Sequence, residues 1–279
     1  MDYSQLYWIS LIVSLGIFWS LDGWLSHFHD TGQNLTHGYN NILLAIINTL
    51  LMFVLASWAA GIIYLVEDNQ LGLMTALGLP IWAKVVIGFL WVDFIIYATH
   101  FLKHRWNWLW RLHLVHHNDT QVDATTVLRQ HPGEAAVSFV VLSASTALLG
   151  IPSFAVMIFY CVANPITVIQ HVNIRIPDAI DRPLSYVLNT PNMHKVHHLV
   201  DIDLSNSNYG YVLSFWDRCF GTYISPSKQT QWNFGVAEYS TEESTKVSDL
   251  LIAPLETGKT ASDSKISESA DDSGSQSNV

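Results

Sequence analysis

The chain has 279 residues, of which 50% are hydrophobic and only 13% are charged, and it carries 11 Trp, 11 Tyr and 12 Phe. This composition is too apolar for an ordinary soluble domain of this size and indicates a membrane protein. The formal net charge is −10, but much of the negative charge lies in the Ser- and Asp-rich C-terminal segment. Because Lys and Arg form no stripe along the chain, nucleic acid is excluded as a partner.

Apolar runs occupy residues 6–21, 42–66 and 85–99. The second run is long enough to cross a hydrocarbon core of about 30 Å, which takes about 20 helical residues, and the other two would include flanking residues. No basic segment precedes the first run and no small-residue cleavage site follows it. We therefore expect a retained span rather than a signal peptide.

The fourth apolar run, residues 135–170, is too long for one span and is interrupted by Gly-Ile-Pro at 150–152. This breaker predicts two short helices joined by a tight turn. Such a hairpin returns the chain to the side that it left, so the segments before and after it would face the same compartment. The alternative is that the third run or the hairpin is re-entrant.

Positive charge favours the cytoplasm as that compartment. Lys84 is the only Lys or Arg in the first hundred residues, whereas several Lys and Arg residues flank the hairpin on both sides. By the positive-inside rule, both flanking segments are then cytoplasmic. The flanking cations are Lys103, Arg105, Arg111, Arg129, Arg175, Arg182, Lys195 and Arg218.

Histidines recur in three motifs near the ends of these runs. ATHFLKH contains an H-x-x-x-H pair, and LHLVHHN and NMHKVHHLV each contain H-x-x-H-H. On a helix, positions i, i+3 and i+4 share one face, so each motif presents at least two imidazoles side by side. Desolvating so many imidazoles would be costly unless a cation held them neutral. The motifs therefore predict ligands for more than one metal ion at His100, His104, His113, His116, His117, His194, His197 and His198.

Five further histidines lie outside these motifs. His171 follows the hairpin and would emerge at the same membrane surface, so we interpret it as another ligand. His131 precedes Pro and Gly, and we expect it to make structural hydrogen bonds or to orient a ligand. The spacing of His27, His29 and His37 fits no regular site, and we interpret them as part of a polar loop.

The histidine motifs resemble those of the fatty acid hydroxylase and sterol desaturase superfamily of integral-membrane di-iron oxygenases. The resemblance covers about residues 93–223 and includes R-x-H-P-x-E at 129–134, H-x-N at 171–173 and the closing segment NYGYVLSFWDRCFGTY. One position departs from the pattern, because Phe101 stands where the family often has Arg directly after the first histidine.

The resemblance implies an all-α fold: a multi-pass membrane bundle of about four to five membrane helices, with a cytoplasmic helical cap that carries a histidine-rich dimetal site. It implies two non-haem iron ions as cofactors, O2 as co-substrate and a lipid from the bilayer as substrate. Electrons would come from a separate reductase, ferredoxin or cytochrome. The implied ligands and catalytic residues are His100, His104, His113, His116, His117, His171, His194, His197 and His198.

Four other residues are candidates for orienting these ligands. Asp93 lies seven residues before His100 on the same helix face and could accept an imidazole N–H. Asp217 and Asn208 in the closing segment could do the same, and His131 is the fourth candidate.

We divide the chain into three segments. Residues 1–84 form N-terminal membrane helices, and residues 85–225 form the catalytic domain with its membrane hairpin at 135–170. Residues 226–279 form a polar tail, which we expect to be disordered from about residue 257.

The leading prediction is hydroxylation of an unactivated C–H bond in a lipid, for which sterols, fatty acyl chains and isoprenoids are all compatible. A lipid desaturase is the first alternative, because both reactions begin with hydrogen abstraction. A metal transporter or sensor is disfavoured, because transport sites lie near the membrane midplane and these motifs lie at span ends. The C-terminal residues give no support for retention in the endoplasmic reticulum, and we expect a bacterial inner membrane.

Overall fold

The computed structural model describes residues 3–25, 27–28, 35–229, 231–237 and 246–256. Regular secondary structure in these ranges is helical, and β pairing is limited to two isolated bridges, Leu188 with Leu213 and Leu199 with Phe234. The expected disorder from about residue 257 falls outside the described residues.

Five long helices form a bundle, and each is long and apolar enough to cross a membrane. Large apolar side chains on their outer faces are exposed, including Phe53 at 78% and Trp58 at 77%. Such surfaces suit a hydrocarbon solvent rather than water. The all-helical membrane bundle is thus confirmed. The five helices are α1 (Tyr3–Leu25), α2 (Leu35–Asp68), α4 (Ile81–Arg105), α6 (Pro132–Leu149) and α7 (Ser153–His171).

Two of these helices extend beyond the apolar runs that predict them. α2 begins at Leu35 because the polar residues His37 and Asn41 are buried against the cap rather than exposed to water. α4 continues to Arg105, so His100 and His104 lie one turn apart on the same helix.

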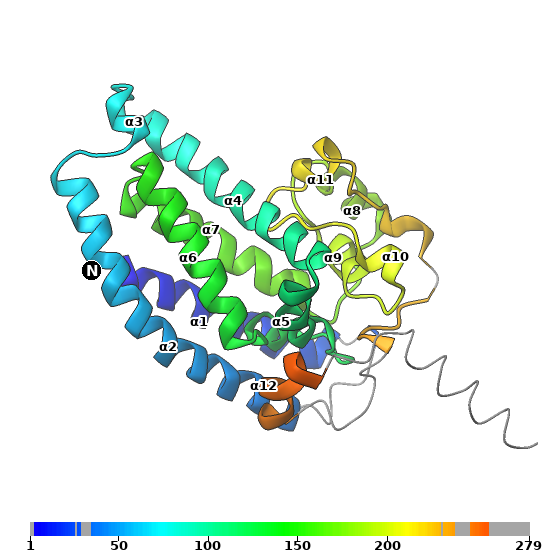
Figure 1. Ribbon diagram of the computed structural model, residues 1–279. Coiled ribbons are helices and arrows are strands. Elements are labelled where there is room, and N and C mark those ends of the chain that lie inside the picture. Colours follow the sequence, from blue (N-terminus) through cyan, green and yellow to red (C-terminus); the bar gives the residue numbers. More distant parts are fainter. Residues whose placement is uncertain (1–2, 26, 29–34, 230, 238–245, 257–279) are drawn as a thin grey trace, which may run out of the picture.

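The predicted hairpin is confirmed, with α6 and α7 running in opposite directions (Figure 1). Between them Gly150 has φ 67° and ψ 43°, a left-handed conformation that costs other residues roughly 1–2 kcal/mol. Pro152 then precedes the first turn of α7. The start of α6 and the end of α7 therefore lie at the same end of the bundle.

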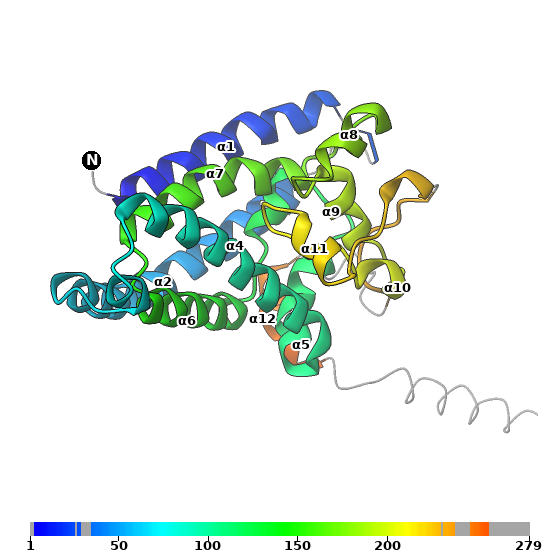
Figure 2. The same ribbon diagram turned by 90° about the horizontal axis from the view of Figure 1, so that it is seen from above.

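The bundle consists of two helix pairs joined by a fifth helix. α7 packs along α1, α6 packs along α2, and α4 contacts both α6 and α7 (Figures 1 and 2). The short helix α3 (Leu73–Ala76) lies at the end of the bundle where α2 leads to α4.

The other short helices gather at the opposite end and form a cap over the ends of α4 and α7 (Figure 1). An apolar core of Val122, Val196, Leu199 and Phe234 packs inside this cap. The cap elements are α5 (Asn107–His117), η1 (Ala124–Leu128), α8 (Asp178–Leu184), α9 (Pro191–His197), α10 (Ile202–Ser205), α11 (Phe215–Cys219), η2 (Pro226–Lys228) and α12 (Val247–Glu256).

Candidate metal centre

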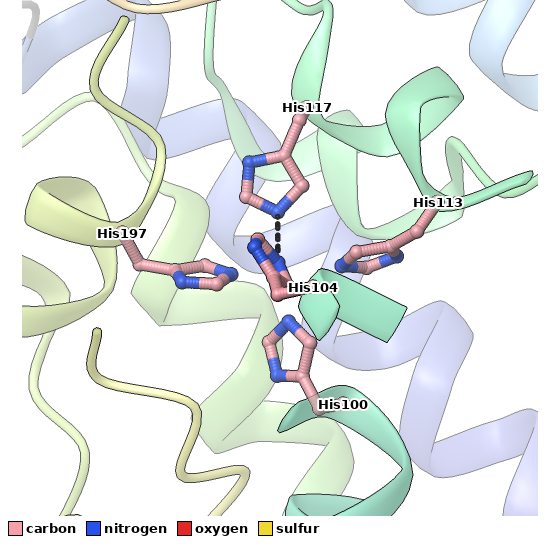
Figure 3. Close-up of side chains that lie close together, drawn as sticks. All are labelled: His100, His104, His113, His117 and His197. Carbon is pink, nitrogen blue, oxygen red and sulfur yellow. Dashed lines mark hydrogen bonds between the residues drawn. The ribbon is translucent and has the colours of Figure 1, made fainter. Parts of the chain in front are cut away.

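The nine histidines expected as ligands meet in the cap in two groups. Within each group, one ring nitrogen from every member lies within 4.8 Å of the others. The first cluster combines side chains from α4, α5 and α9, and the second combines side chains from α5, α7 and α9. The first cluster is His100, His104, His113, His117 and His197 (Figure 3), and the second is His116, His171, His194 and His198.

Each H-x-x-H-H motif contributes to both clusters. Successive residues of a helix differ in direction by about 100°, so the paired histidines at the end of a motif point to different sides. His117 faces the first cluster while its neighbour His116 faces the second, and His197 and His198 divide in the same way. Each motif therefore supplies ligand candidates to both clusters rather than to one of them.

The Nε2 atoms point into the clusters. In the first cluster, Nε2 of His104 lies 3.2 Å from Nε2 of His117 (Figure 3). In the second, Nε2 of His194 lies 2.9 Å from that of His171 and 3.1 Å from that of His198. Nitrogen atoms of several residues would approach one another this closely around a shared cation.

Hydrogen bonds at Nδ1 turn several of these rings inward. His100 donates to the carbonyl of Tyr209 at 3.0 Å, His197 to that of Ser207 at 2.7 Å, and His171 to that of Thr167 at 2.7 Å. Because a carbonyl can only accept, the proton of each neutral ring lies on Nδ1 and the lone pair lies on Nε2. The donor atoms are therefore oriented for a metal.

Several inward nitrogens have no hydrogen-bond partner among the described residues. The buried Nε2 atoms of His100, His113 and His197 are of this kind. An unsatisfied buried polar atom costs free energy, and a bound cation would satisfy all three. The nitrogen donors thus fit a pair of transition-metal ions, one in each cluster.

Burial keeps these rings in the form that binds metal. Burial, followed by repulsion from neighbouring imidazoles, holds the pKa of His116, His117 and His198 well below the ordinary value. Burial is the main reason that the pKa of His197 falls to about 3, and repulsion from His113 is the next. Neutral imidazole is the ligating form, so no proton has to leave before metal binding at neutral pH.

Glu134 in the first turn of α6 orients a histidine of the first cluster. Its Oε1 accepts hydrogen bonds from Nδ1 of His113 and from Nζ of Lys103, both at 2.8 Å, and its side chain is buried. A carboxylate in this position fixes the orientation of the ring and makes its other nitrogen a stronger ligand for a metal ion. The R-x-H-P-x-E element contained this residue, but the sequence assigned it no role.

Asn206 has a similar contact that the sequence did not indicate. Its Oδ1 lies 3.3 Å from Nδ1 of His104, where it accepts a hydrogen bond. The signal was weak, because Asn206 belongs to no histidine motif and its partner lies 102 residues earlier.

Asp93 does not orient an imidazole. Its carboxylate accepts hydrogen bonds from the backbone N–H of Val212 at 3.0 Å, from that of Leu213 at 3.2 Å, and from the indole of Trp216 at 2.9 Å. The position seven residues before His100 is on the right face but roughly 10 Å further along the helix axis. Asp93 therefore anchors the closing segment, and its expected contact with a ligand is wrong.

The other three candidates bind backbone groups near the clusters. Asp217 accepts hydrogen bonds from the N–H groups of Tyr209 and Gly210, both at 2.8 Å. It therefore holds the segment in which the carbonyl of Tyr209 accepts a hydrogen bond from His100. Asn208 donates to the carbonyl of Met193 at 3.1 Å. The Nδ1 atom of His131 accepts from Gly133 at 3.0 Å at the start of α6. Asp217 and Asn208 therefore contact segments next to the ligands rather than the rings, and His131 contacts the start of α6, which carries Glu134.

The polar-loop interpretation is wrong for His37, which lies in the first turn of α2. The ring is buried, and its Nε2 lies 2.9 Å from Oδ1 of Asp119. His27 is exposed, in agreement with the interpretation, and His29 lies outside the described residues.

Exchanging Glu134 for Gln tests whether this carboxylate supports metal binding. Gln keeps the shape but cannot accept two hydrogen bonds with a full negative charge, so we expect metal affinity to fall by roughly 10–100-fold. Competition with a chelator, using purified metal-loaded protein, measures this affinity. The matched control is Glu67→Gln at the far end of α2, and equal affinities for the two variants would contradict the assigned role.

Comparison with known proteins shows which family the histidine-bearing region resembles. Residues 85–222 match the family described as fatty acid hydroxylase. The chain is 28% identical over 157 residues to ornithine lipid hydroxylase OlsE of Rhizobium tropici, covering 56% of this chain and 46% of that protein. It is 33% identical over 141 residues to alkylglycerol monooxygenase of Danio rerio, covering 50% and 30%.

A cholesterol 25-hydroxylase-like protein of Caenorhabditis elegans is 24% identical over 173 residues, covering 61% of this chain and 56% of that protein. The chain therefore spans about half the length of these relatives, or less. No solved structure gives a significant match. The matched region contains every histidine of the two clusters. Over residues 85–222, this membrane protein belongs to the fatty acid hydroxylase family.

Proposed function

We propose that the protein is a membrane-bound di-iron oxygenase that hydroxylates an unactivated C–H bond of a lipid, using O2 and external electrons. The observation that carries this proposal is the convergence of nine buried or partly buried imidazoles into two adjacent clusters at one end of a membrane bundle. Family membership supports iron as the metal, because the donor set by itself also suits other transition metals.

The nine clustered histidines would hold the two ions. Iron at these positions would supply O2 activation and the oxidising power for the C–H bond. The protein contributes a neutral ligand set, which leaves the positive charge of the ions uncompensated. Burial of the rings excludes water from the reacting groups, and Glu134 keeps His113 in place.

A lipid substrate is supported by the position of the clusters. His100 and His104 lie in the last turns of α4, and His171 ends α7, so the metal positions lie directly above membrane-spanning segments. The names of the relatives refer to an ornithine lipid, an alkylglycerol and cholesterol. We infer hydroxylation rather than desaturation, since those names describe hydroxylases and a monooxygenase.

A metal transporter is disfavoured by the same geometry. Transport sites lie near the membrane midplane, between discontinuous helices. Here both clusters lie at one end of the bundle, and most of their members come from the short cap helices α5 and α9.

We infer that the cap faces the cytoplasm, in a bacterial inner membrane. Three of the flanking cations are buried, namely Lys103, Arg129 and Lys195. The others remain at the cap end, whereas Lys84 lies near the other end of α4. Even without the three buried cations, the cap end of the bundle therefore carries more positive charge than the opposite end. The electron donor would be a separate cytoplasmic reductase, ferredoxin or cytochrome.

Lipid analysis tests the proposed reaction. Cells that express the protein should contain a lipid with one added oxygen that is missing from cells expressing a His194→Ala, His197→Ala variant, which removes one histidine from each cluster. Untargeted mass spectrometry of total lipids, at equal membrane abundance and with a reductase supplied, measures this difference. His27→Ala is the matched control, because His27 is exposed and outside both clusters.

A lipid that has instead lost two hydrogens would move the assignment to a desaturase. Identical lipids in the intact and double-variant cells would contradict both reactions and favour the transporter or sensor.

Labelling of a native cysteine tests the orientation. Cys219 is exposed in the cap, and Cys161 lies within α7. A membrane-impermeant maleimide should label Cys219 in inverted inner-membrane vesicles but not in intact bacterial cells. The Cys219→Ser variant reports any labelling of Cys161, and labelling of Cys219 in intact cells would contradict a cytoplasmic cap.

A further inference from the structure

We propose that α1 and α2, which precede the matched region, form part of the metal centre, with Asp22 and His37 as positioning residues for the second cluster. This proposal rests on the proposed dimetal function. The family match begins at residue 85, yet side chains from both N-terminal helices reach into the segments that carry the proposed ligands.

Asp22 joins the end of α7 to η1. It lies in the last turn of α1 and is 1% exposed. Its Oδ1 accepts from the backbone N–H of Asn173 at 2.6 Å, and its Oδ2 accepts from that of Ala124 at 2.7 Å. Asn173 follows His171 by two residues. Hydrogen bonds to a carboxylate are short and strong, so Asp22 fixes the distance between these two segments.

Lys195 acts on the same end of α7 from the other side. This fully buried side chain donates to the carbonyls of Gln170 and Val172, the residues on either side of His171. Lys195 also directly follows His194 in α9. The segment bearing His171 is therefore held between α1 and α9.

His37 connects α2 to the turn that follows α5. Its Nε2 lies 2.9 Å from Oδ1 of Asp119, and its Nδ1 lies 3.4 Å from Oδ2 of Asp123. Asp119 comes three residues after His116 and also accepts from the hydroxyl of Thr126 at 2.6 Å. The imidazole thus ties the end of α5 and the start of η1 to a membrane helix.

Asn41, one turn further along α2, strengthens this connection. Its amide donates to the hydroxyl of Thr125 at 2.9 Å, and its oxygen accepts from Arg129 at 3.4 Å. The carbonyl of Arg129 in turn lies 3.3 Å from Nδ1 of His116. A chain of hydrogen bonds therefore runs from α2 to a ring of the second cluster.

Two features hold rings of the first cluster without the N-terminal helices. His100 and His104 share one rigid helix, and Glu134 holds His113. Both clusters take rings from three elements, but only the second includes a ring from the end of α7, the segment that Asp22 binds. Metal sites tolerate only small displacements of their ligands. Loss of Asp22 or His37 should therefore weaken the second metal position selectively.

Iron retention tests this selectivity. Full-length Asp22→Asn and His37→Gln proteins would be purified, loaded anaerobically with Fe(II) and challenged with a chelator, and iron per chain would be followed by elemental analysis. Wild type should retain one ion per cluster. Each variant should lose one of its two ions roughly 10–100-fold faster and keep the other. The matched controls are Asp68→Asn and His27→Ala, since both side chains are exposed.

A second background identifies the cluster. His171→Ala removes a ligand of the second cluster, so the ion that remains belongs to the first. Adding Asp22→Asn to this background should leave the release of that ion unchanged. Adding it to His100→Ala should accelerate release of the remaining ion.

Thermal unfolding, recorded in parallel, separates positioning from general stability. Wild-type release rates for both ions in the variants would overturn the proposal. Equal acceleration for both ions, together with a lower unfolding temperature, would also overturn it, because the residues would then only stabilise the fold. A wild-type protein that binds no iron would contradict the proposed function itself, and this proposal with it.

Discussion

The orientation of buried imidazoles is the constraint on which the rest of this structure depends. A histidine ring inside a protein is stable without a charge only if its donor nitrogen finds an acceptor and its other nitrogen finds a cation or a donor. Here backbone carbonyls accept hydrogen bonds from Nδ1 of His197 and His171, and Glu134 accepts one from Nδ1 of His113. The Nε2 atoms are left facing one another, which is unfavourable unless a metal lies between them.

The architecture of the cap follows from the need to bring these rings together. Two clusters are built from motifs on α5 and α9 because adjacent histidines of one helix point about 100° apart. Each motif can therefore serve both clusters, and α4 and α7 supply the remaining members from the membrane bundle. The hairpin between α6 and α7 makes this possible, since it returns the chain to the cap before the second motif begins.

The sequence predicted those parts that depend on local pattern. The breaker at 150–152 indicated the hairpin, and spacing indicated which histidines would converge. It did not indicate which ring joins which cluster, because that depends on how α5 and α9 pack. It also missed contacts between distant residues, since Glu134 lies 21 residues from His113 and His37 lies 82 residues from Asp119. The expected contact of Asp93 with a ligand failed because residues on one face of a helix can lie at different positions along its axis.

The most direct test of the account is the location of bound metal in the protein itself. Crystals of the iron-loaded chain, measured at the iron absorption edge, would give an anomalous difference map that shows iron alone. The account predicts two peaks, one surrounded by the Nε2 atoms of the first cluster and the other by those of the second. A single peak between the clusters, or no peak at either, would contradict the central claim that nine histidines form a paired metal site.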